Sequence, residues 1–448
     1  MKRSHIVFGL ALSVMAGCRP TVNTDVPSAH NLDLSRYVAV GNSTTAGSAD
    51  GSLYRSSQLN SFPNILAKQF ALVGGGEFNQ PLLPGETGWP VDYSSGNAEE
   101  WRRPKLILAH TTDCQNNQLV APVYYYESLD TAGGSNSVAG NAPFNNLGIP
   151  GVRVVDYMSA GYSLVNPYAA RTFASDMETP MDQIHKIHPS FFTLWLGGND
   201  VLGYAMSGGE EHSMPSHPNN ISNLQAFAKN YDSVVVALLR NGAKGVLMNI
   251  PDIASLPFFT TIPHNGLMLD GDLATSLNML YSQSGLSFTP GSNPFVIEDP
   301  DAAPFGYRFI NQGEYILLSI PQDSMKCAGW GSIKPIPKRF VLTAGEVSRI
   351  KDATAAFNAH ILQKSIDYRV AFADMNTFMK SLVKGFAYNG AYYSADYITG
   401  GAFSLDGIHP NPRGNALIAN ELIRVINSYY STSVPPVDVH AYSGIKFP

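Results

Sequence analysis

The stretch FFTLWL at residues 191–196, followed at once by Gly-Gly-Asn-Asp at 197–200, indicates the fold most directly. An apolar run without alternation is typical of a strand that is covered on both faces, as at the centre of a parallel sheet. The two glycines allow a sharp turn after the strand, and Asn199 then stands at its carboxyl end, where open α/β sheets bind their ligands. The stretch therefore predicts an α/β fold with functional side chains along one edge of the sheet.

Short apolar runs and helical stretches alternate along the rest of the chain, which is the pattern of a parallel sheet with crossover helices. Strands are predicted at residues 36–41, 245–250 and 370–375, and helices at 61–73, 221–240, from 343 through 361, and at 412–426. Thr343 begins one of these helices, and Glu346 three residues later completes a capping-box pattern. Two segments, near 50–141 and 257–338, are rich in Gly, Pro, Ser, Asn and Tyr and are only weakly periodic. We interpret them as insertions over the carboxyl ends of the strands, since a separate second domain would need a clearer linker.

A nucleophile and a base are suggested by two turns far apart in the sequence. Ser43 lies in GNSTTAG at residues 41–47, directly after a predicted strand, and its hydroxyl would need a base to become nucleophilic. Asp406 and His409 lie in DGIHPN at residues 406–411, so that a single turn can place the carboxylate beside the imidazole ring. Each turn alone also has an ordinary interpretation, as a hydrogen-bonding loop or as the cap of the following helix. For that cap Asn411 is the better candidate, because it precedes a proline at the first helical position.

Two further turns offer hydrogen-bond donors of the kind that stabilise an oxyanion. The Asn199 side chain is an uncharged donor, and Gly151, in NLGIPG at residues 146–151, can present its backbone N–H without a side chain in the way. In isolation each would be read as an ordinary turn. In combination with Ser43 and His409 they point to acyl transfer.

The four segments, in this order, resemble the four motif blocks of the SGNH/GDSL hydrolase superfamily, with LGGND and DGIHPN as the closest matches. The resemblance implies a three-layer α/β/α sandwich with a flavodoxin-like parallel sheet. It also implies that Ser43 is the nucleophile, His409 the base and Asp406 the residue that orients it, with an oxyanion hole made by Ser43, Gly151 and Asn199. The expected activity is that of a GDSL-type lipase or carboxylesterase working through an acyl-enzyme, with no cofactor.

One position departs from the superfamily pattern, because the first block reads Gly41-Asn42-Ser43-Thr44 rather than GDSL. Asp406, not residue 42, is the expected triad acid, so we expect the chemistry to be retained with altered electrostatics around the nucleophile. Other functions remain open at this point: a carbohydrate O-deacetylase or an acyltransferase of the same fold, or a non-catalytic lipoprotein that binds a glycan or lipid.

The N-terminus predicts export and a lipid anchor. Lys2 and Arg3 precede a short apolar run at residues 6–16, and small residues precede Cys18, as in the processing site of a bacterial lipoprotein. We therefore expect a signal peptide at 1–17, a tether at 18–35, a hydrolase domain at 36–432 and a tail at 433–448. The protein would be attached to a bacterial envelope membrane, the outer one being favoured, through a lipid on Cys18.

Composition and minor motifs limit the other partners. The formal net charge of -6 gives no basic surface for nucleic acid, which we exclude as a partner. His185 and His188 have a spacing seen in metal sites, but no cluster of carboxylates or cysteines accompanies them, so no metal is expected. Tyr124–Tyr126 and Trp195 are weaker candidates for a pocket wall, and Trp195 is expected in the core. Cys114 and Cys327 are able to pair in an oxidising compartment or to remain free thiols.

Overall fold

A computed structural model describes residues 26–90, 104–125 and 136–448 and contains a central parallel sheet. The sheet has five strands, β6 (Asn146–Gly148), β1 (Tyr37–Gly41), β7 (Phe191–Trp195), β8 (Lys244–Met248) and β15 (Ala371–Ala373), in that spatial order. All four neighbouring pairs are parallel. In chain order this is 2-1-3-4-5, the flavodoxin-like order, so the predicted sheet is confirmed.

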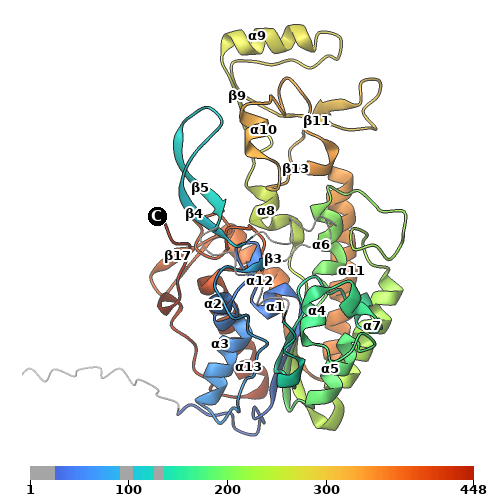
Figure 1. Ribbon diagram of the computed structural model, residues 1–448, viewed down its shortest axis with the longest axis vertical. Helices are drawn as coiled ribbons and strands as arrows, with labels where there is room; N and C mark the ends of the chain where they lie inside the picture. The colour runs from blue at the N-terminus through green and yellow to red at the C-terminus, as the bar shows by residue number, and fades with distance from the viewer. Residues whose placement is uncertain (1–25, 91–103, 126–135) are drawn as a thin grey trace, which may run out of the picture.

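Helices cover both faces of the sheet, which gives the predicted three layers (Figure 1). On one face, α3 (Phe62–Ala71) packs against α13 (Pro412–Tyr430). On the other, α11 (Ala344–Tyr368) packs against α7 (Leu224–Leu238), which in turn contacts α5 (Pro180–Ile187). The predicted capping box is present, because the Thr343 N–H donates to the Glu346 carboxylate at 2.7 Å. Shorter helices complete these layers: α1 (Ser43–Ala46), α2 (Arg55–Leu59), α4 (Pro167–Thr172), α6 (Asn199–Met206), α8 (Pro257–Thr260) and α12 (Met375–Lys384).

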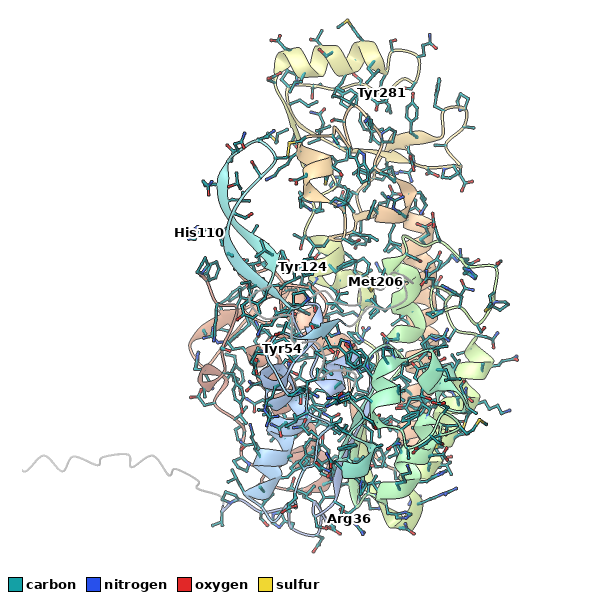
Figure 2. All side chains as sticks on the ribbon, in the orientation of Figure 1. Arg36, Tyr54, His110, Tyr124, Met206 and Tyr281 are labelled. Carbon is teal, nitrogen blue, oxygen red and sulfur yellow. A yellow bond between two sulfur atoms is a disulfide. The ribbon has the colours of Figure 1, made fainter. Side chains whose placement is uncertain are left out.

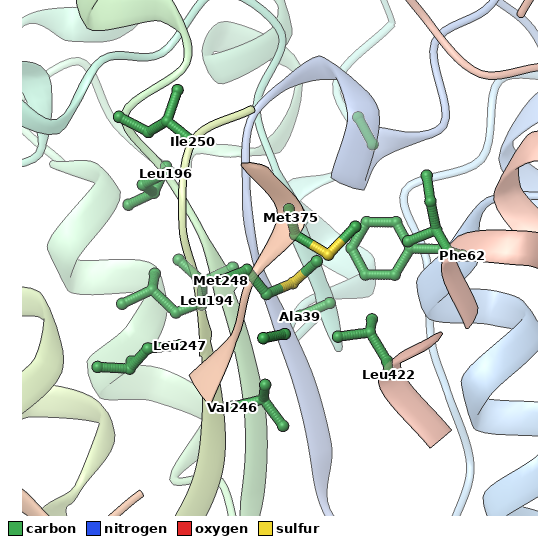
Figure 3. Close-up of a cluster of buried hydrophobic side chains, with 14 of the residues drawn as sticks. Ala39, Phe62, Leu194, Leu196, Val246, Leu247, Met248, Ile250, Met375 and Leu422 are labelled. Atoms are coloured by element: carbon green, nitrogen blue, oxygen red, sulfur yellow. The ribbon is translucent and has the colours of Figure 1, made fainter. Parts of the chain in front are cut away.

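Apolar side chains pack against both faces of the sheet, as Figure 3 shows. Val246, Leu247 and Met248 succeed one another on β8, and their side chains alternate between the two faces as the strand period requires. Phe62 of α3, Leu422 of α13 and other buried apolar residues close one face, and all of the labelled β8 residues are fully buried. A strand buried on both sides explains why the sequence of the central strands lacks alternation.

The second predicted insertion forms a lobe, residues 262–341, that stands beyond the carboxyl edge of the sheet (Figure 1). It contains α9 (Gly271–Leu280), α10 (Gln322–Lys326) and the short strands β9 (Leu267–Leu269), β10 (Gly291–Asn293), β11 (Val296–Glu298), β12 (Tyr307–Phe309) and β13 (Tyr315–Ile316). Two small apolar clusters of its own stabilise the lobe, one around Ile297 and Ile336 and one around Leu277 and Tyr281. Tyr281 lies at the far end of the molecule from Arg36, which precedes β1 (Figure 2).

The first insertion contains a hairpin, β4 (Leu106–Thr112) and β5 (Gln118–Tyr124), that reaches the lobe. The two regions are joined by a disulfide between Cys114 and Cys327 and by an ion pair between Lys326 and Asp113 at 3.3 Å. The sequence left this pairing open. The remaining short pairs are β2 (Ser52–Leu53) with β3 (Trp89–Pro90), β13 with β14 (Val341–Leu342), and β16 (Phe386–Tyr388) with β17 (Ala391–Tyr393).

Cys18 and the predicted signal peptide lie outside the described residues, as does Tyr126. Among the residues that are described, no helix combines the length and the apolar character needed to cross a bilayer.

Candidate active site

The first site turn follows β1, whose five residues are all buried. Gly41 is required here, because a Cβ on this residue would lie 2.0 Å from the Thr45 hydroxyl. The chain then turns into α1, where the Asn42 side chain accepts a hydrogen bond from the Thr44 N–H at 3.2 Å. Ser43 is thereby the first residue of a short helix at the carboxyl edge of the sheet, with only 5% of its surface exposed.

The second turn brings His409 to Ser43 from the other end of the chain. His409 Nε2 lies 2.8 Å from Ser43 Oγ, the geometry in which a neutral imidazole accepts the hydroxyl proton. His409 is buried and lies three residues before α13, and Asn411 caps that helix by accepting from the Gly414 N–H at 2.9 Å. The predicted cap is therefore confirmed, and the long helix fixes the turn that carries the histidine.

Asp406 completes the chain of contacts, because its Oδ2 lies 2.8 Å from His409 Nδ1. Its other oxygen accepts from the Ile408 and His409 N–H groups, both at 2.8 Å, so that the turn of residues 406–409 closes on its own carboxylate. Burial alone would raise the pKa of Asp406. The nearby His409 and hydrogen bonds from His409 and Gly51 outweigh it and lower the pKa to about 2. The carboxylate therefore stays charged at any pH at which the histidine could act as a base.

Asp50 and Gly51 also hold the turn that carries Asp406. The sequence did not predict this role. The Gly51 N–H donates to Asp406 Oδ2 at 2.8 Å, and Asp50 Oδ1 accepts from the Leu405 N–H at 2.9 Å. The Asp50 N–H donates to the hydroxyl of Ser404, which lies 3.0 Å from Asp406 Oδ1. Asp50 is half-buried, and the loss of water around its carboxyl raises the pKa of that group. The segment that follows the nucleophile is thus bonded directly to the segment of the triad acid.

The two expected oxyanion donors lie on neighbouring turns. Asn199 begins α6 after a three-residue turn that follows β7, and its Nδ2 donates to the Val152 carbonyl at 2.9 Å, one residue beyond Gly151. Gly151 has a φ of 81°, a left-handed conformation that favours glycine. Asp200 connects the same two turns, because it accepts from the Val154 N–H at 2.9 Å, and burial raises its pKa to about 7.

A cavity of about 90 Å³ extends from Ser43, His409 and Asn199 into the molecule. Its wall is mainly apolar, and α12 contributes Met375, Phe378, Met379 and Leu382 to it. These positions follow the i, i+3, i+4, i+7 pattern of one helix face, so periodicity could have revealed this helix, which the sequence reasoning passed over. Gly151 is not part of this wall.

Trp195 differs from the expectation that it belongs to the core. It is half-buried and lines the cavity, while its indole N–H donates to the Asn249 carbonyl at 3.1 Å. Since it is the last residue of β7, it lies where the buried strand opens into the site. Tyr124 lies at the end of β5, and His185 and His188 lie at the end of α5, none of them in the cavity wall.

The model of the family described as GDSL-like Lipase/Acylhydrolase matches residues 37–422. No curated protein matches the chain. Among solved structures, the extracellular lipase from Streptomyces rimosus matches with 12% identity over 88% of this chain and 98% of that one, with a TM-score of 0.33.

Proposed function

This chain belongs to the GDSL-like lipase/acylhydrolase family, and we propose that it hydrolyses esters through Ser43, His409 and Asp406. The observation that carries the proposal is the continuous set of contacts from Ser43 Oγ through the imidazole to the Asp406 carboxylate, both at 2.8 Å. A protein that only binds its ligand has no need to keep a buried base in contact with a serine hydroxyl.

In the proposed reaction, His409 Nε2 takes the proton of Ser43 as its oxygen attacks the ester carbonyl. The Asp406 carboxylate accepts a hydrogen bond from the Nδ1–H group and holds the ring in the tautomer that leaves Nε2 free. The negative charge on the tetrahedral intermediate is bound by the N–H groups of Ser43 and Gly151 and by the Asn199 side chain. His409 then protonates the leaving alcohol, and a water molecule activated by the same ring releases the acid from the acyl-enzyme.

The substrate we propose is an ester of an apolar acyl chain rather than an acetylated sugar. The cavity that opens at Ser43 is lined in part by five apolar residues that can pack against an acyl chain: Met375, Met379, Leu382, Phe403 and Ile418. An acetyl group would leave most of this apolar wall in contact with water. This lining therefore favours lipase or carboxylesterase activity over deacetylation.

Hydrolysis of p-nitrophenyl esters from acetate to palmitate tests the proposal. Ser43→Ala should abolish turnover and also prevent covalent labelling by a fluorophosphonate. Ser48→Ala is a matched control, because this buried serine lies in the same segment and its hydroxyl has no partner among the described residues. Activity that survives in a folded Ser43→Ala protein would refute the assignment, and a maximum at acetate would favour the deacetylase alternative.

We further propose that the protein is an exported lipoprotein, with a signal peptide at 1–17, a tether at 18–35 and one hydrolase domain at 36–432 before the tail at 433–448. The charged start, the short apolar run and Cys18 support this organisation. The Cys114–Cys327 disulfide adds support, because such bonds persist in oxidising compartments such as the periplasm. Labelling with radioactive palmitate in a bacterial host should mark the wild-type protein and not Cys18→Ala. Equal labelling of the two would exclude an anchor on this cysteine.

A further inference from the structure

A second cavity, of about 420 Å³, lies beside the catalytic one and has no part in the mechanism above. It lies between α12, β16 and α13, and Pro436 of the C-terminal segment forms part of its wall. Phe378 lines both cavities. On α13, Ile418 faces the catalytic cavity while its neighbour Leu417 faces the second one. The two spaces therefore adjoin at Phe378 and along this edge of α13.

The polar residues of the second cavity are already bonded to protein partners. Asn420 donates to the Val437 carbonyl and accepts from the Val437 N–H, at 3.0 and 2.8 Å. Asn427 donates to the Val434 carbonyl at 2.9 Å, and Arg424 forms an ion pair with Glu421 at 2.6 Å. What remains for a ligand is the apolar part of the wall: Phe378, Phe386, Leu417, Ile423 and Pro436. A wall of this kind suits a hydrocarbon chain, which needs no hydrogen-bond partner.

We infer that Phe378 is the specificity-determining residue for acyl-chain length, and that the second cavity behind its ring accepts the distal part of a long acyl chain only when the ring is removed. The inference rests on the proposed function, since the chain must start from an ester carbonyl at Ser43. In the wild-type protein the Phe378 ring ends the catalytic cavity and limits the acyl group to shorter chains. Removal of the ring joins the two cavities. Each additional methylene of the substrate that then leaves water should raise kcat/KM about fourfold.

Replacement of the ring tests the inference directly. Phe378→Ala should raise the ratio of kcat/KM for p-nitrophenyl palmitate to that for the octanoate by at least ~10-fold, the effect of about two buried methylenes. Phe378→Leu, which disturbs the packing less, should change the ratio in the same direction by a smaller factor. An unchanged ratio in both folded variants would overturn the inference.

A double variant distinguishes use of the second cavity from general loosening of the site. Ser381 is half-buried and lines only the second cavity, so Ser381→Trp should fill that space. On its own it should leave the wild-type chain-length profile unchanged, and combined with Phe378→Ala it should abolish the gain on palmitate. A gain that persists in the double variant would show that the long chain lies elsewhere.

Fatty-acid binding supplies a readout that does not depend on turnover. Trp195 lines the catalytic cavity, so its fluorescence should report an occupied acyl site. Phe378→Ala should bind palmitate at least ~10-fold more tightly than the wild type and octanoate about equally. This shift is expected even if the protein hydrolyses no ester, so failure of the proposed function and failure of the chain-length assignment can be told apart.

Discussion

The carboxyl edge of the sheet and the lobe at residues 262–341 differ in what holds their residues in place. At the edge, Ser43, Asn199 and His409 stand on short turns, and each turn joins a buried strand or a long helix of the main core. The lobe packs around small apolar clusters of its own and supplies none of the described residues of the catalytic cavity wall. The main core therefore builds the reactive geometry, and the lobe meets that core at Leu317 and lies beside the Gly407 turn through Leu318. Substitutions at the edge should therefore change kcat, and substitutions in the lobe should change stability.

The largest effect should come from the triad acid. Asp406→Asn keeps the size of the side chain but favours the wrong tautomer of His409, and kcat should fall by about 10⁴-fold. Glu314→Gln in the lobe is the matched comparison, because Glu314 also is a buried carboxylate, paired with Arg308 at 2.7 Å. It should leave kcat within about twofold of the wild type while lowering the melting temperature. Similar kinetics in the two variants would abolish the distinction between edge and lobe.

A smaller loss is expected at the oxyanion donor. Asn199→Ala should lower kcat by about 10²–10³-fold, because the developing charge on the intermediate loses one fixed donor. KM should change little, since the donor acts mainly in the transition state. Steady-state kinetics with one activated ester provide both constants. A rise in KM at constant kcat would instead assign Asn199 to ground-state binding.

The central strands and the site turns could be predicted from the sequence. FFTLWL and the runs around 36–41 and 245–250 predicted strands because burial on both faces imposes a continuous apolar run, and β7, β1 and β8 lie within two residues of those ranges. The turns of Ser43 and Asn199 were readable because Gly and Asn follow two of these strands, and the turn of Asp406 and His409 because Asn411 and Pro412 mark the start of a helix. Asp50 was not, because its partners Ser404 and Leu405 lie more than 350 residues away and no local pattern records such contacts.

The lobe was readable only as an insertion. Its strands are two or three residues long, too short for an alternation to be recognised, and its two clusters join residues from many short segments. Trp195 illustrates the same limit at a single position. A strand period predicts which face a side chain takes, but not where along the strand the covering helices end and a cavity begins.

Removal of the Cys114–Cys327 disulfide tests whether the lobe and the hairpin contribute to stability rather than to catalysis. Cys114→Ser with Cys327→Ser should lower the free energy of unfolding by about 2–4 kcal/mol, because the bond restricts a long loop in the unfolded chain. Since neither cysteine lines the catalytic cavity, kcat on short esters should stay within about twofold. Urea unfolding and ester kinetics on the same preparation measure both. A large fall in kcat would mean that the lobe and hairpin position the site after all.

The smallest effect on the reaction barrier is expected at Asp50, whose hydrogen bonds hold the turn that carries Asp406. Asp50→Ala leaves the Leu405 N–H without its acceptor and lets the Asp406 turn relax, so kcat should fall about 10-fold, the equivalent of about 1.4 kcal/mol in the barrier. KM should remain unchanged, because Asp50 lines no part of the cavity.

Asp50→Asn distinguishes the effect of the Asp50 hydrogen bonds from the effect of its negative charge. The amide oxygen can still accept from Leu405, and the amide N–H can donate to the Tyr54 hydroxyl that now lies 2.6 Å from the carboxylate. Most of the lost kcat should therefore return in this variant, whereas Tyr54→Phe, which removes no bond to residues 404–406, should cost less than Asp50→Ala. Equal losses in Asp50→Ala and Asp50→Asn would mean that the negative charge of Asp50, rather than its hydrogen bonds, acts on His409. The pH dependence of kcat/KM would then differ between these variants and the wild type, an effect that a positioning role does not produce.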